Sequence, residues 1–100
     1  MDAVLVEAFL PISSLDAVEK ALLGLGVCNI SVAKVRGYSR CVDFLSRDHL
    51  TEQAKVEVIA ARDDAMRVAN AIREAAEPGE GVVAILPTQA AFKVGSASGG

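Results

Sequence analysis

The chain has 100 residues, of which 52% are hydrophobic, 23% charged and 4% aromatic, and its formal net charge is −3. This length predicts one domain, and so apolar a composition excludes a largely disordered chain. The acidic balance gives no general attraction to nucleic acid, and no apolar stretch approaches the roughly 20 residues that cross a bilayer. The first residues carry no basic region, which excludes a secretory signal.

The first predicted unit is a strand followed by a helix. Residues 4–10 are apolar and rich in β-forming side chains, and Pro11 predicts where the strand stops. Ser13 or Ser14 offers an N-cap for the helix. The helix is predicted from an apolar stripe at helical spacing and from glycines at its exit, namely Leu15, Val18, Leu22, Leu25, Gly24 and Gly26.

A second extended run and a polar segment form the middle of the chain. Residues 27–38 are rich in β-branched side chains, which favours a long strand. Residues 39–53 are polar and mixed in charge, which predicts an exposed loop. A loop of that length in a small domain is usually functional or mobile.

The second half repeats the strand and helix pattern. Residues 55–61 predict a strand, and Asp63 or Asp64 is a candidate cap for a helix that ends near Pro78. Residues 81–86 predict the last strand. The domain is expected to span residues 1–94, with a flexible tail over residues 95–100.

The order strand, helix, strand, strand, helix, strand predicts an α+β fold, the ferredoxin-like βαββαβ sandwich. In it, two helices cover one face of a four-stranded antiparallel sheet. The other face is expected to carry apolar residues, namely Val4 or Leu5, Ala33, Val35 and Ile59. The mean hydropathy of +0.38 is high for so small a domain. Both observations predict that further copies of the chain cover this face.

The chain has two cysteines and one histidine: Cys28, Cys41 and His49. Two cysteines are too few for a disulfide framework, and the spacing of the three residues matches no zinc signature. We interpret the thiols as those of a protein in a reducing cytoplasm. Because no nucleophile and base form a catalytic pattern, the sequence predicts that the protein is not an enzyme.

Two glycine-containing segments are candidates for anion binding. One is Gly37, Tyr38, Ser39 and Arg40, and the other is Gly79, Glu80 and Gly81. Glycine lets backbone N–H groups approach an anion, and a guanidinium can donate two hydrogen bonds to a phosphate. Each segment is also explained without a ligand, the first as a basic strand end and the second as a helix stop and turn.

Four segments together resemble the PII family of nitrogen-regulatory signal proteins over residues 4–94. The most specific is Ile30–Arg40, which is similar to the strand that leads into the family's T-loop. Residues 15–27 resemble the first helix and its exit, residues 55–61 the third strand, and residues 79–81 the B-loop.

This resemblance implies a homotrimer with adenine nucleotides bound in the clefts between subunits. It implies that the T-loop base and the B-loop contact the phosphates, through Gly37, Tyr38, Ser39, Arg40, Gly79, Glu80 and Gly81. It implies that the adjacent subunit holds the adenine and ribose through Ser31 and Glu57, with Ile59 and Ala8 as apolar walls. Lys93 would reach the phosphates from the neighbouring subunit.

The chain departs from the family at three places. Cys41 stands where the family has a glutamine that helps to hold magnesium and 2-oxoglutarate, and the loop after Arg40 is short, so neither 2-oxoglutarate sensing nor uridylylation is expected. Val82 replaces a lysine, and Gly95 replaces a second basic residue of the tail. Because these losses remove cations, we predict that ADP or AMP is preferred over ATP.

The short loop resembles divergent members of the family that are associated with carboxysomes and bicarbonate transport. This subgroup implies bicarbonate as a second ligand, placed near Arg40, and a partner protein such as a membrane transporter, with no membrane insertion of the chain itself. Two alternatives stay open. One is a metal-binding CutA-like trimer with Cys28, Cys41 and His49 as ligands, and the other is a small enzyme or a regulatory domain that binds amino acids.

Overall fold

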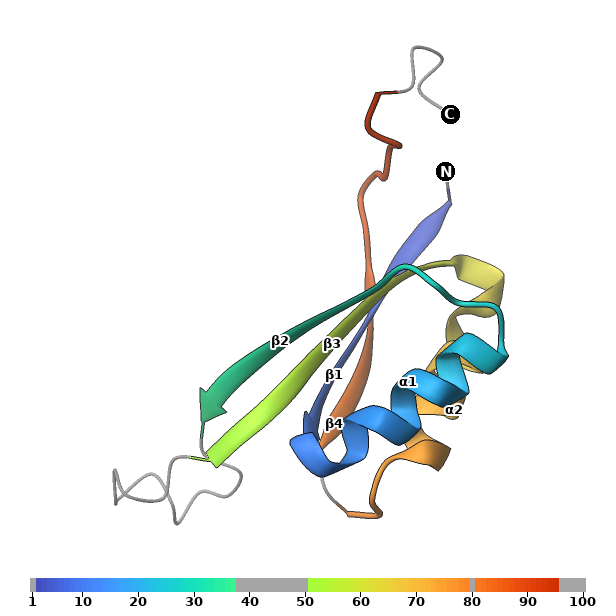
Figure 1. Cartoon of the computed structure of the whole chain (residues 1–100). Coiled ribbons are helices and arrows are strands. Elements are labelled where there is room, and N and C mark those ends of the chain that lie inside the picture. The colour runs from blue at the N-terminus through green and yellow to red at the C-terminus, as the bar shows by residue number, and fades with distance from the viewer. Residues whose placement is uncertain (1, 38–50, 80, 96–100) are drawn as a thin grey trace.

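The architecture is described by a computed structural model, which covers residues 2–37, 51–79 and 81–95. Two helices lie on one side of a sheet (Figure 1). The elements in chain order are β1 (Ala3–Pro11), the 3-10 helix η1 (Ile12–Ser14), α1 (Leu15–Gly24), β2 (Ile30–Gly37), β3 (Thr51–Ala61), the 3-10 helix η4 (Arg62–Asp64), α2 (Ala65–Ala75) and β4 (Val82–Pro87). Within these ranges, no helix has both the length and the apolar character that a membrane span requires.

The sheet has the strand order β2-β3-β1-β4, and all neighbouring strands are antiparallel. Both the element order and this topology confirm the predicted ferredoxin-like α+β fold. Because β1 and β2 both run antiparallel to β3, they are parallel to each other. The ends of β1 and β2 and the starts of β3 and β4 therefore share one end of the sheet (Figure 1).

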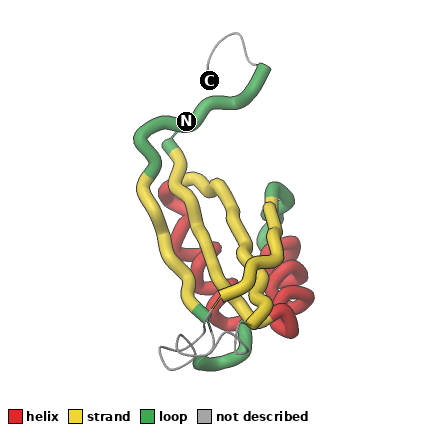
Figure 2. The backbone as a smooth tube through the Cα atoms, turned by 90° about the vertical axis from the view of Figure 1, so that its left-hand side faces the viewer, coloured by secondary structure: helices red, strands yellow, loops and turns green. Residues whose placement is uncertain are grey.

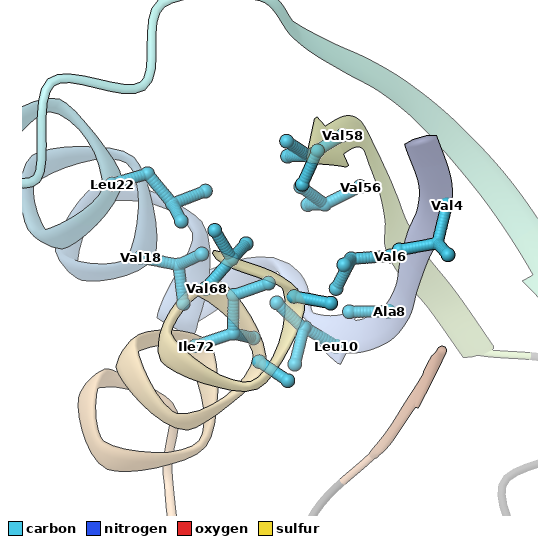
Figure 3. Packing of buried hydrophobic residues seen from close by; sticks show 13 residues of the cluster. Val4, Val6, Ala8, Leu10, Val18, Leu22, Val56, Val58, Val68 and Ile72 are labelled. Atoms are coloured by element: carbon cyan, nitrogen blue, oxygen red, sulfur yellow. The ribbon is translucent and has the colours of Figure 1, made fainter. Parts of the chain in front are cut away.

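The core lies between the helices and one face of the sheet. Successive residues of a strand point to opposite faces, and in β1 and β3 every second side chain is buried against the helices. Side chains of α1 and α2 meet this face (Figure 3). The largest fully buried side chains are Leu10, Leu22, Ile72, Val6, Val18, Val56, Val58 and Val68.

The opposite face, which we call the open face, carries the alternate residues of each strand. Leu5 lies on it, whereas Val4 is buried in the core, so the structure decides between the two predicted residues. Ile59 and Leu86, which pair with Leu5 from either side, remain 48% and 38% exposed. The open face therefore carries a row of exposed apolar side chains that includes the predicted Leu5 and Ile59, and α1 and α2 both lie on the other side of the sheet (Figure 1).

Two strand boundaries differ from the prediction by more than one residue. β2 begins at Ile30 instead of residue 27, because the N–H groups of Gly26 and Val27 donate to the carbonyls of Leu23 and Leu22 and so complete the end of α1. β3 begins at Thr51, so residues 51–53 are strand and not loop. The rest of the predicted loop, residues 39–50, lies outside the described residues.

The predicted N-cap residues stand at the right positions, but the capping hydrogen bonds predicted for them do not form. Ser14 and Asp64 occupy the N-cap positions of α1 and α2, but neither side chain makes a capping hydrogen bond. Ser14 Oγ instead accepts a hydrogen bond of 3.0 Å from the backbone N–H of Glu77, and Ser13 Oγ donates to Glu77 Oε1 at 2.8 Å. The turn between β1 and α1 therefore holds the segment that leaves α2.

Replacing Ser14 with alanine should lower the free energy of unfolding by about 1–3 kcal/mol. Ser14 is 2% exposed, so its loss leaves the partly buried N–H of Glu77 without its acceptor. Urea denaturation followed by circular dichroism measures the change. Ser13→Ala is the matched control, because it removes an exposed hydrogen bond and should cost less than about 0.5 kcal/mol. Equal losses in the two variants would contradict the assignment.

Candidate functional site

One group of predicted ligand residues lies together on the open face. Ser31 of β2 pairs with Glu57 of β3 in the sheet, so their side chains are neighbours. Ile59 follows two residues later on the same face of β3, and 48% of it is exposed. We call Ser31, Glu57 and Ile59 the base group, after the role predicted for them.

A lysine connects the base group to a second carboxylate. Lys55 Nζ lies 3.9 Å from Glu57 Oε1 and 3.9 Å from Glu7 Oε2. Glu7 and Glu57 are paired across β1 and β3, and the side chains of Lys55 and Glu57 are 32% and 35% exposed. Two carboxylates thus share one ammonium group. Their oxygens keep acceptor capacity, which suits the hydroxyl donors of a sugar.

A second group lies where α2 leads into β4. Gly79 and Gly81 border a cleft of about 510 Å³ between the end of α2 and the start of β4. Arg73 and Glu77 also line this cleft, so a guanidinium lies near the glycines. Sequence reasoning missed Arg73, although its place in the last turn of α2 is a signal that could have found it. Glu80 lies outside the described residues.

Gly37 ends β2 at the same end of the sheet as Gly79 and Gly81. Its carbonyl accepts a hydrogen bond of 3.2 Å from Thr51 Oγ1. β2 and β4 are nevertheless the two edges of the sheet, with β3 and β1 between them. At about 4.8 Å per strand, their backbones are roughly 14 Å apart. Tyr38, Ser39 and Arg40 lie outside the described residues.

Lys93 lies at the other end of the molecule. Thr88 Oγ1 donates to the carbonyl of Ala3 at 2.7 Å, and the chain then runs past the start of β1 (Figures 1 and 2). β4 separates this segment from Gly81, and its six residues span about 20 Å. Phe92, Lys93 and Val94 are all exposed. Within one chain, therefore, the structure does not bring Lys93 to the glycines.

Two further points concern Ala8, which was predicted as an apolar wall of the nucleotide site, and the metal site of the CutA-like alternative. Ala8 is fully buried under the helices, so the prediction that it forms an apolar wall of the site is wrong. Among residues 2–37, 51–79 and 81–95, no three His, Cys, Asp or Glu side chains gather as they would around a metal ion. Cys28 is exposed, while Cys41 and His49 lie outside the described residues, so the metal site of the CutA-like alternative stays untested.

Comparisons with known proteins agree on one family. The profile described as "Nitrogen regulatory protein P-II" matches residues 3–96. The crystal structure of Arabidopsis thaliana PII bound to citrate is similar with a TM-score of 0.78 and 27% sequence identity, over 93% of this chain and 83% of that chain. A search of curated protein sequences found no significant match.

Proposed function

Since the chain belongs to the P-II family of nitrogen regulatory proteins, we propose that it is a signalling protein that binds ADP or AMP between the subunits of a homotrimer. One observation carries this proposal. The candidate ligand residues are spread over the open face and both ends of a single chain, so one copy cannot enclose a ligand with all of them. They converge only if neighbouring copies meet.

The apolar open face supplies the reason for copies to meet. Burial of apolar surface contributes roughly 25 cal/mol per Å² to association. The row Ile59, Leu5 and Leu86 crosses three strands without a charge. Covering this row brings the base group of one subunit to the surface of the next, and Lys93, which is exposed, would contact the phosphates across the boundary.

The phosphate end of the proposed site carries few cations. Val82 follows Gly81 directly and is 64% exposed, at the position where the family resemblance implies a lysine. Lys93, Arg40 and Arg73 are the cations that we propose for the phosphates. A charge-assisted hydrogen bond contributes about 1.5–3 kcal/mol to binding. Missing cations therefore lower the affinity for a triphosphate more than the affinity for a diphosphate or a monophosphate.

The proposed role is regulatory and not catalytic. Ligand contacts at Arg40 would favour one arrangement of the loop that follows, which a partner protein then recognises. A membrane transporter is the proposed kind of partner, and bicarbonate is a second proposed ligand, because a small anion suits the guanidinium of Arg40. These roles fit a protein of the cytoplasm.

Isothermal titration calorimetry with AMP, ADP and ATP tests the proposal. ADP or AMP should bind at least as tightly as ATP, and ATP bound tenfold more tightly than ADP would contradict the preference. Lys93→Ala should weaken ADP binding by about tenfold or more, because a charged phosphate contact is lost.

The matched control is Lys20→Ala. Lys20 pairs with Asp16 at 3.0 Å on the exposed side of α1, which belongs to the helical layer and not to the open face. It should leave the ADP affinity unchanged, and both variants should elute from a sizing column as trimers. Equal ADP affinity in Lys93→Ala and the unchanged protein would show that Lys93 does not belong to the nucleotide site. Binding of copper or zinc without any nucleotide would favour the CutA-like alternative.

A further inference from the structure

Two hydrogen bonds from η1 hold Glu77, which lies in the segment that leads from α2 to the candidate glycines. The backbone N–H of Glu77 donates to Ser14 Oγ at 3.0 Å, and Ser13 Oγ donates to Glu77 Oε1 at 2.8 Å. Ser14 is buried, whereas Ser13 is exposed. The two serines therefore act on different parts of Glu77: Ser14 fixes its backbone, and Ser13 fixes the direction of its carboxylate.

The Glu77 carboxylate lies close to the glycines that we propose for the phosphates. Glu77 lines the cleft of about 510 Å³ together with Gly79 and Gly81, and Gly79 comes only two residues later in the chain. No ion pair within the described ranges includes Glu77. Ser13 does not line this cleft, so its hydrogen bond holds Oε1 at η1 and away from the glycines.

A carboxylate released beside these glycines would compete with a phosphate in two ways. Its oxygens accept hydrogen bonds as phosphate oxygens do, so it could take the backbone N–H of Gly79, two residues along the chain. It would also repel a bound phosphate, because both groups are negatively charged. The hydrogen bond from Ser13 opposes both effects, since it occupies Oε1 of Glu77.

We propose that Ser13 is a positioning residue, which keeps the phosphate site open by holding the Glu77 carboxylate away from Gly79 and Gly81. The inference rests on the proposed nucleotide function and adds to it a residue that sets the phosphate affinity without contacting the phosphate. The role of Ser13 depends on the charge of Glu77. Without that charge, the Ser13 hydroxyl should matter little to nucleotide binding.

A double-mutant cycle on Ser13 and Glu77, with ADP binding measured by calorimetric titration, tests this inference. Ser13→Ala should lower the ADP affinity about fivefold, because it releases the carboxylate. When Glu77→Gln is also present, Ser13→Ala should change the ADP affinity by less than about twofold, because the amide carries no charge. Ser13→Thr keeps the hydroxyl and should keep the ADP affinity. Since Ser13→Ala is expected to change the stability little, unfolding does not account for its loss of affinity.

Two results would overturn the inference while leaving the proposed function in place. One is an unchanged ADP affinity in Ser13→Ala. The other is an equal loss from Ser13→Ala with and without Glu77→Gln, which would show that Ser13 acts through the fold and not through the carboxylate. If the unchanged protein binds no adenine nucleotide, the proposed function fails and the inference fails with it.

Discussion

Gly81→Ala should lower the free energy of unfolding by about 3 kcal/mol or more, the largest stability effect that we expect from a single methyl group in this chain. A Cβ at Gly81 would overlap the carbonyl oxygen of Phe9 and crowd the Cα of Leu10. Phe9 pairs with Val82, so the obstacle is the backbone of a paired strand and cannot move aside without opening β1 from β4. The backbone angle φ of Gly81 is also +94°, a value that residues other than glycine rarely adopt.

Thermal unfolding at a fixed protein concentration should show this loss as a fall in Tm of more than about 12 °C. Gly79→Ala is the matched control. Gly79 has φ +79° but nothing within 4 Å of an added Cβ, so only the left-handed backbone penalty of about 1–2 kcal/mol applies. Similar losses in both variants would show that the contact with Phe9 is not what requires glycine. Gly81 is thus required by the fold whether or not it contacts a phosphate.

The fold could be predicted because its local signals agree with one another. In β1, Val4, Val6 and Ala8 alternate with side chains that are less buried, and α1 and α2 repeat apolar residues at helical spacing. Each pattern fixes the type of an element and the face that it buries. The order of the elements then restricts the topology to a few possibilities, of which the ferredoxin-like arrangement is one.

The boundaries that were mispredicted depend on contacts between distant residues. Thr51, Glu52 and Gln53 are polar and read as loop, yet they pair with Gly37, Arg36 and Val35 and so lengthen β3. Ser14 has the composition of a cap but bonds Glu77, which is 63 positions away. Propensity is a local quantity, so it could not anticipate either pairing.

The candidate ligand residues could be proposed from the sequence one by one, but their arrangement could not. The register of β2 and β3 places Ser31 beside Glu57. No local pattern shows that Lys93 lies at the opposite end of the sheet from Gly79, because that placement follows from the direction of β4.

The second large effect concerns assembly. If the chain forms the proposed trimer, Leu86→Asp should convert it into monomers at micromolar concentration. Leu86 is 38% exposed on the open face, where Leu5 and Ile59 continue its apolar row. A carboxylate there would have to lose its water without a partner of opposite charge, which costs several kcal/mol in each subunit. Light scattering after a sizing column should show a single 10.4 kDa chain in place of three.

Met66→Asp is the matched control, because Met66 is 60% exposed at the start of α2 and belongs to the helical layer. It should remain a trimer. Because the proposed nucleotide site takes the base group from one subunit and Lys93 from another, Leu86→Asp should also lose ADP binding although it changes no candidate ligand residue. A monomeric Leu86→Asp variant that still bound ADP with the original affinity would show that one chain completes the site alone. The nucleotide site would then not be shared between subunits.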